Sequence, residues 1–165
     1  MQPTDKDLAE FALLALEFKL IGLPQIVAWG DKVIEARDDP PTWALDLSMA
    51  QDVESVNTIL NQMQWERGTL TPYLAQKMLF HLTYKKWKSS ELHWQDIRLI
   101  FWDGRLSPDK KSASELHDFE ILSGTILALW EELDGGFITE PEIVTVVNNY
   151  FQSYDPSSTP LPSWV

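Results

Sequence analysis

The sequence predicts an all-α fold, a single-domain irregular bundle of about seven to eight helices. Apolar residues recur at helical spacing through nearly every segment. Capping residues, prolines and glycines separate these segments at short intervals, as they commonly do between helices. Clear strand hairpins are absent from the pattern. We therefore expect one helical domain over residues 1–154, followed by a Pro- and Ser-rich extended tail over residues 155–165.

Capping signals place the first two helices. Thr4 is suited to cap the first helix, with Asp7 as the residue that completes the cap three positions later. Gly22 is expected to end that helix, and Pro24 stands where the first turn of the second helix should lie. The run at 38–41, Asp-Asp-Pro-Pro, predicts a firm break, because each proline disfavours helix at the residue before it.

A short third helix and a longer fourth complete the acidic half of the chain. The third helix is expected to begin at Pro41, with Trp43 and Leu47 facing inward. Asp52 is expected to cap the fourth helix. The apolar residues of the fourth helix predict its inward side: Val53, Val56, Ile59, Leu60 and Met63.

The fifth and sixth helices follow Arg67-Gly68. A threonine cap and an N-terminal proline at 71–72 begin the fifth helix, which runs to Trp87. Ser90 is expected to cap the sixth helix, and Asp103-Gly104 to end it.

A long helix and a final element of uncertain type close the domain. The apolar stripe over 114–133 predicts the long helix, which the glycine pair at 135–136 ends. Thr139 and Glu142 form a capping-box pattern, which favours a last helix over 140–153. The valines of that segment would suit a strand equally well, so both possibilities stay open. Trp164 is a candidate to pin the tail to the domain.

Composition narrows the class of protein. The chain has no cysteine, which removes disulfides and thiol chemistry and fits a reducing cytoplasm. The acidic start lacks the pattern of a signal peptide, and no apolar run is long enough to span a membrane. With a pI near 4.5, DNA is a poor partner, because binding would bring like charges together. We expect a cytoplasmic protein with no membrane or DNA partner.

The charges are strongly segregated along the chain. Residues 1–64 hold eleven carboxylates against four basic side chains, and residues 112–165 hold nine carboxylates with no Lys or Arg. Residues 65–111 reverse the balance, with nine basic side chains against five acidic ones. Ordinary helical surfaces mix both signs, since Glu–Lys pairs stabilise them. Such segregation favours oppositely charged partners and speeds their encounter.

Metal and catalytic motifs are lacking in the sequence. The three histidines, His81, His93 and His117, have none of the spacings typical of metal ligands. The segment 131–142 resembles a calcium loop in length, but Leu133 and Gly135 stand where oxygen ligands are needed. Nucleophile elbows and glycine-rich phosphate loops are also absent. We therefore predict no catalytic residue, metal or cofactor, although two carboxylates from separate helices could still converge as acid and base.

One basic cluster is interleaved with aromatic residues. Tyr84 precedes the run Lys85-Lys86-Trp87-Lys88. The cluster could contact RNA or phosphate by stacking and charge. The favoured interpretation is a helix C-terminus, where cations meet the negative end of the helix dipole.

The acidic clusters are the candidate binding residues. We define a first acidic surface and a second acidic surface, each proposed to contact a partner or, alternatively, to serve only solubility. The first acidic surface comprises Asp31, Glu35, Asp38, Asp39 and Asp46. The second acidic surface comprises Glu131, Glu132, Asp134, Glu140 and Glu142.

One segment resembles part of a known group of proteins. Trp29-Gly30-Asp31 followed by the run at 40–48, Pro-Pro-Thr-Trp-Ala-Leu-Asp-Leu-Ser, resembles small uncharacterised bacterial proteins related to immunity proteins of polymorphic or contact-dependent toxin systems. The resemblance covers about 20 of the 165 residues and contains no functional motif. It implies a non-enzymatic protein that neutralises a basic, nuclease-like toxin by occluding its active site.

Three functions follow as hypotheses. The first is an acidic binding protein, namely an immunity protein as the resemblance implies, whose partner is a basic protein such as a cognate toxin. The second is a helical adaptor that self-associates into a homo-oligomer, with the basic middle of one copy against an acidic end of another. The third is an enzyme whose catalytic carboxylates come from separate helices.

Overall fold

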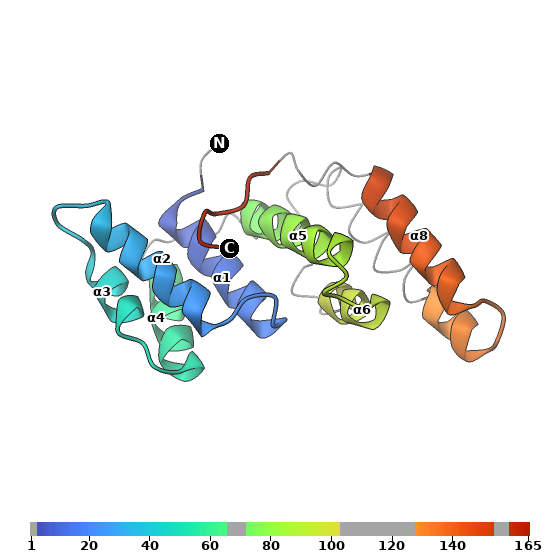
Figure 1. The fold of residues 1–165 in the computed structure, drawn as a ribbon. Coiled ribbons are helices and arrows are strands. Elements are labelled where there is room, and N and C mark those ends of the chain that lie inside the picture. Colours follow the sequence, from blue (N-terminus) through green and yellow to red (C-terminus); the bar gives the residue numbers. More distant parts are fainter. Residues whose placement is uncertain (1–2, 66–71, 103–127, 154–158) are drawn as a thin grey trace. The chain divides into compact units, whose positions relative to one another are not determined.

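The chain is an all-α helical bundle, as the sequence predicts. The computed structural model describes residues 3–65, 72–102, 128–153 and 159–165, and no strand occurs among them. The helices are α1 (Asp5–Glu17), α2 (Leu23–Glu35), α3 (Thr42–Ser48), α4 (Val53–Trp65), α5 (Pro72–Lys88), α6 (Trp94–Trp102) and α8 (Glu140–Ser153), and residues 128–134 are also helical (Figure 1). The chain groups into a first unit, Met1–Leu79 with Pro160–Val165, and a second unit, Phe80–Thr159.

In the first unit, α1 packs against α4. The predicted capping box begins α1: Asp7 N–H donates to Thr4 Oγ1 at 3.2 Å, and Thr4 N–H donates to Asp7 Oδ2 at 2.8 Å. These two bonds satisfy backbone donors that the helix itself leaves free. The apolar sides of both helices are buried, and they include Phe11, Ala12, Ala15, Val56, Leu60 and Met63.

Helices α2 and α3 come together at Gly30. A Cβ atom built there would lie 2.8 Å from the carbonyl oxygen of Ala44 and 2.9 Å from the backbone nitrogen of Ser48. A side chain would therefore push the two helices apart, which explains a glycine in the middle of a helix. Trp29 and Trp43 pack beside this crossing, with ring centroids 5.1 Å apart. The segment 29–48 is thus a tightly packed helical hairpin around the proline turn.

The C-terminal residues Pro160–Val165 belong to the first unit and pack in it through Trp164, as predicted. The Trp164 ring stacks on Trp29 at 5.3 Å and packs against Phe11 at 5.8 Å, and it is only 8% exposed. Lys32 Nζ donates to the carbonyl oxygen of Ser163 at 2.8 Å. Figure 1 shows this segment, in dark red, running back to α1 and α2. Trp164 therefore completes the aromatic core between α1 and α2.

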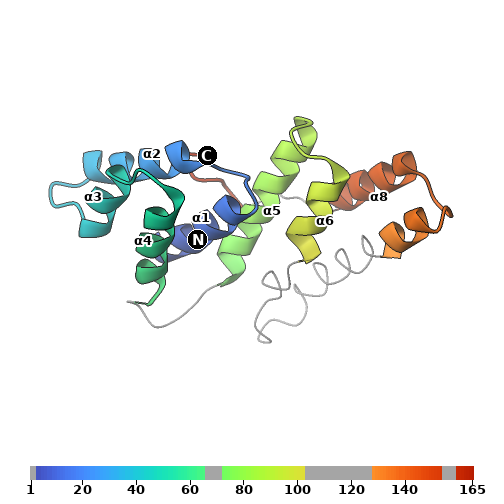
Figure 2. The same ribbon diagram turned by 90° about the horizontal axis from the view of Figure 1, so that it is seen from below.

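In the second unit, aromatic side chains join α5 to α8. Phe151 on α8 packs against Phe80 and Tyr84 on α5, with ring centroids 5.3 Å away in each case. Trp87 Nε1 donates to Asn148 Oδ1 at 2.9 Å. Helix α6 turns back beside α5 and contacts α8 (Figure 2). The last element is therefore a helix, and its strand alternative is wrong because Ile143, Val147 and Phe151 share one buried helical side.

Two helix ends differ from the prediction. Helix α1 ends at Glu17, and Lys19, with φ 58°, turns the chain, so Gly22 instead precedes α2 as its N-cap. Ser90 is not the cap of α6: with φ 60° it follows the end of α5, and α6 begins at Trp94. In both turns a non-glycine residue adopts the left-handed conformation, because two backbone hydrogen bonds close the end of the helix.

Several predicted features lie outside the described residues. They are the cap at Thr71, the turns at Arg67-Gly68 and Asp103-Gly104, the long helix over 114–127, and His117. Within the described part of the long helix, residues 128–134 are helical, and Arg98 Cζ on α6 lies 3.9 Å from the Trp130 ring centroid.

Candidate functional site

All ten predicted carboxylates are exposed to solvent. The first acidic surface belongs to the first unit, and the second acidic surface belongs to the second unit. Exposure is expected both for carboxylates that only interact with water and for carboxylates that bind a partner. The neighbouring residues of each carboxylate are therefore needed to distinguish these two roles.

Part of the first acidic surface has structural partners. Asp31 on α2 accepts a hydrogen bond from the Ser48 hydroxyl on α3, and so fastens the two helices beside Gly30. Arg37 forms an ion pair with Asp5 at 3.2 Å, which places a cation next to Asp38 and its neighbour Asp39 in the chain. Asp31 therefore has a structural role in joining the two helices. The surface near the proline turn carries both positive and negative charge.

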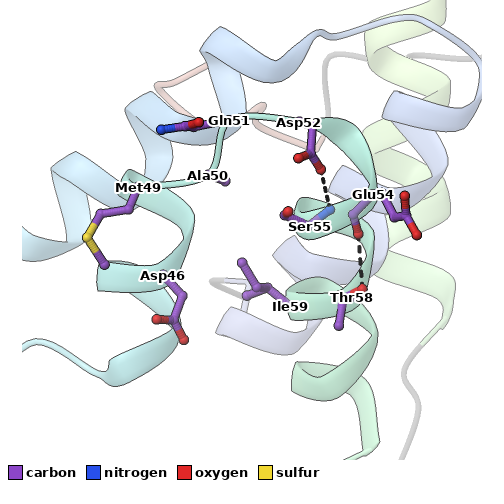
Figure 3. Close-up of a pocket in the computed structure, with 9 residues that line it drawn as sticks. All are labelled: Asp46, Met49, Ala50, Gln51, Asp52, Glu54, Ser55, Thr58 and Ile59. Atoms are coloured by element: carbon purple, nitrogen blue, oxygen red, sulfur yellow. Dashed lines mark hydrogen bonds between the residues drawn. The ribbon is translucent and has the colours of Figure 1, made fainter.

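Asp46 lies in a different setting, at an open hollow in the first unit. The hollow has a volume of about 680 Å³ and lies where α3, the following turn and the start of α4 meet (Figure 3). We call it the acidic hollow. It is lined by Asp46, Met49, Ala50, Gln51, Asp52, Glu54, Ser55, Thr58 and Ile59. Three of these residues are carboxylates and none is basic, so the hollow is negatively charged.

Local helix capping fixes the acidic rim. Asp52 caps α4, as predicted, by accepting a hydrogen bond from Ser55 N–H at 2.7 Å. This backbone hydrogen bond is the largest cause that lowers the pKa of Asp52 below its ordinary value. Asp52 is therefore ionised at neutral pH, and the cap holds its carboxylate at the edge of the hollow.

Apolar side chains accompany these charges. Met49 is 70% exposed, and Ile59 on α4 points into the hollow (Figure 3). Leu45 and Val53, which flank the same turn, are also exposed. In such a site the exposed aliphatic groups can supply apolar contact area and the carboxylates can supply charge. Methionine also adapts readily to differently shaped surfaces.

The sequence pattern alone missed most of this hollow. Asp52 was predicted only as a helix cap. Val53 was predicted to face inward from α4, and this prediction is wrong because Val53 is exposed. Helical periodicity shows which residues share a side, but it does not show how far the neighbouring helix extends along that side. The signal that could have found the hollow is the cluster of acidic and apolar residues around the short turn at 49–52.

The second acidic surface surrounds a tight turn. Gly136 has φ +74°, and Phe137 N–H donates to the carbonyl oxygen of Glu132 at 2.7 Å, which ends the helix at the predicted glycine pair. Glu142 accepts hydrogen bonds from Thr139 N–H and Oγ1, so one of the two bonds of the predicted capping box of α8 is present, while Glu142 N–H donates to the carbonyl oxygen of Thr139. The backbone bond from Thr139 lowers the pKa of Glu142. Glu142 therefore has a structural role in addition to its charge.

The basic aromatic cluster makes contacts within the second unit. Lys86 Nζ lies 2.6 Å from Glu91 Oε2, and Lys88 Nζ lies 6.0 Å from the Tyr84 ring centroid. The three lysines occupy the last turn of α5. These contacts agree with the helix C-terminus interpretation.

The two described histidines also make internal contacts. His81 Nδ1–H donates to the carbonyl oxygen of Thr159 at 2.6 Å. His93 N–H donates to Asp96 Oδ2 at 2.7 Å at the start of α6. Within the described ranges, no group of three or more His, Cys, Asp or Glu residues could hold a metal ion. Over the same ranges, every helix is too short or too polar to cross a membrane.

Comparison with known proteins adds no relative. The chain matches no protein-family model, no curated protein and no solved structure. Its function must therefore be inferred from its own residues.

Proposed function

We propose that this protein binds a basic partner protein, without catalysing a reaction, and that the partner docks in the acidic hollow. The observation that carries the proposal is the combination of three carboxylates, Asp46, Asp52 and Glu54, with the exposed Met49 around one open hollow. Interfaces gain affinity chiefly from a few well-packed side chains, while complementary charge raises the association rate and selects the partner.

The charge of the whole chain supports a basic partner. A net charge of −12 attracts cationic proteins over a distance set by the Debye length, about 8–10 Å at moderate salt. The same charge repels acidic proteins and nucleic acids. Docking in the hollow would then bury Met49 and Ile59, which are the apolar groups that a charge-only encounter would leave in water.

The ionised state of Asp52 at the edge of the acidic hollow favours a binding role over a role as a general acid. A general acid at neutral pH needs a raised pKa, which usually comes from burial. The pKa of Asp52 moves the other way, because its carboxylate accepts a backbone hydrogen bond. An ionised and solvent-exposed carboxylate is suited to pairing with a cation.

The cellular role that fits these properties is neutralisation of a basic toxin in the bacterial cytoplasm. The segment that resembles immunity-related proteins, at 29–48, forms the hairpin of α2 and α3. Gly30 and the bond between Asp31 and Ser48 hold α3 in place, and α3 carries Asp46 while Met49 follows it directly. In this proposal the resembling segment builds the platform that presents the hollow, and occlusion of a cationic active site requires no catalytic residue here.

The proposal is tested with a basic protein captured on the immobilised chain at low salt, then identified and purified. Association rates are measured for the unchanged protein and for a double variant, Asp46→Asn with Glu54→Gln, which removes two charges with little change of shape. We expect association to slow by about 3- to 10-fold at low salt and the difference to shrink at high salt.

The matched control is Glu17→Gln with Glu35→Gln, which removes the same charge from positions outside the hollow wall. We expect a smaller effect from this pair. Equal rates for the two double variants would mean that only the total charge counts, and the proposed docking in the hollow would then be wrong.

A further inference from the structure

Phe137 is the most exposed large apolar side chain of the described residues, at 82% exposure. It stands in the turn between helical residues 128–134 and α8. A phenylalanine in water gains nothing for folding from its ring, since burial of apolar surface is what stabilises a fold. The turn itself requires only a glycine in the left-handed conformation, which Gly136 supplies. The exposed Phe137 ring is therefore available for contact with another molecule.

The ring lies beside the backbone of the turn that carries it. A Cβ atom at Gly135 would lie 2.7 Å and 2.8 Å from two atoms of the Phe137 ring, so the ring lies against the glycine backbone. The hydrogen bond from Phe137 N–H to the carbonyl oxygen of Glu132 fixes the backbone at the same point. A backbone that is fixed before binding loses less conformational entropy when a partner covers the turn.

Acidic residues close to Phe137 in the chain favour a positively charged partner. The exposed carboxylates of Glu131, Glu132, Asp134 and Glu140 lie within six residues of Phe137 along the chain. The sequence from Ser112 to the end contains no Lys or Arg. A pocket that receives the ring would therefore face several negative charges at its border, and cationic residues there would be favoured.

We propose that Phe137 is an anchor that inserts into an apolar pocket bordered by Lys or Arg on a basic partner protein. The inference rests on the proposed function in one respect, namely that the partner is basic. It adds a contact in the second unit that is separate from the acidic hollow, and it assigns affinity to one aromatic side chain. The carboxylates around the ring contribute mainly to the rate and selectivity of association.

The first test replaces Phe137 by the photo-crosslinking residue p-benzoylphenylalanine in the full chain, expressed in bacterial cells. After illumination, the cross-linked peptide is identified by mass spectrometry. We expect a peptide from a basic protein, with Lys or Arg near apolar residues at the point of attachment. Cross-links only to a second copy of this chain, or no cross-link at all, would overturn the proposal.

The second test measures affinity with the purified cross-linked protein. We expect Phe137→Ala to weaken binding by about 10- to 100-fold, within the range of aromatic anchors, without lowering the unfolding temperature. Gly135→Ala keeps the ring but displaces it, so we expect weaker binding from this variant too. Leu99→Ala is the matched control, because Leu99 is 63% exposed in the same unit and should leave the affinity unchanged.

The two proposals fail in different ways. Weakening by Phe137→Ala with no effect of Asp46→Asn and Glu54→Gln would refute docking in the hollow and support the anchor. The opposite result would refute the anchor and leave the hollow as the contact. An equal loss from Phe137→Ala and Leu99→Ala would also refute the anchor, because any exposed apolar residue would then serve.

Discussion

Gly30 is the residue on which the hairpin of α2 and α3 depends most. Backbone atoms of Ala44 and Ser48 occupy the space that a Cβ atom at Gly30 would need. Backbone cannot move aside as the end of a flexible side chain can, so an added methyl group must separate the helices. The same separation would shift α3 and with it Asp46, which connects the packing of this glycine to the acidic hollow.

We predict that Gly30→Ala destabilises the protein by about 1–2 kcal/mol. Crowding costs about 1–3 kcal/mol, and the better helix propensity of alanine returns up to about 1 kcal/mol. Urea denaturation measures the change. An unchanged or increased stability of Gly30→Ala would contradict the close approach.

The carboxylate of Asp52 gives a second prediction, in the dependence of stability on pH. Its pKa in the folded protein lies below the ordinary value of 3.8, first because Ser55 N–H donates to it. A lowered pKa contributes stability that is present above the ordinary value and is lost as pH falls through the folded value.

We therefore expect Asp52→Ala to lower the unfolding temperature at pH 7 and to have little effect near pH 2. Asp52→Asn should keep part of the cap, since asparagine is also a good N-cap, and should remove the pH dependence of this contribution. Thermal unfolding followed by circular dichroism between pH 2 and pH 7 measures both. A difference between Asp52→Ala and the unchanged protein that stays constant over this range would show that the cap does not depend on the charge.

At the level of the elements, several helix starts could be predicted from the sequence, whereas the start of α6 and some helix ends could not. The caps at Thr4 and Asp52 are confirmed, and Glu142 accepts the predicted bond from Thr139 N–H, because such bonds join residues only two or three positions apart. The turns at Lys19 and Ser90 were missed, because residues other than glycine also adopt the left-handed conformation where backbone hydrogen bonds close the end of a helix. Among the residues that the structure describes, glycine marks such a turn at Gly136.

The candidate site, too, could be predicted from the sequence only in part. The exposure of the ten carboxylates could be predicted from composition and helical spacing. The acidic hollow and the position of the Phe137 ring could not, because both depend on contacts between residues that no local spacing records. The strand-like valines of α8 show the same limit, since burial against α5 and α6 decides the state of the segment.

The C-terminal segment gives a prediction at this level. Trp164 is buried between Phe11 and Trp29, so Trp164→Ala should destabilise the protein by about 2–4 kcal/mol. Its Nε1 makes no hydrogen bond in the described part of the chain, and Trp164→Phe should therefore cost clearly less than Trp164→Ala. Urea denaturation of both variants measures the difference. Equal costs would contradict the packing of the Trp164 ring, because both variants remove the indole nitrogen and only Trp164→Phe keeps an aromatic ring.

At the level of the whole molecule, the association rate depends on the net charge and also on where the individual charges lie. The net charge of −12 affects the approach of any cation, whereas a carboxylate in a contact acts over a few ångströms. Variants that change the net charge equally but at different places can separate the two effects. The two acidic surfaces provide such positions.

We predict that three double reversals, each of which brings the net charge from −12 to −8, slow association with the purified basic partner unequally. Asp46→Lys with Glu54→Lys alters the acidic hollow, and Glu131→Lys with Glu132→Lys alters the surroundings of Phe137. Asp38→Lys with Asp39→Lys alters the proline turn, where Arg37 already supplies a cation. The first two should slow association by about 10-fold or more at low salt and the third by less, because charges outside the contact act only through the screened field. Stopped-flow association rates over a range of salt concentrations measure this order, and three equal slopes would show that the protein attracts its partner by total charge alone.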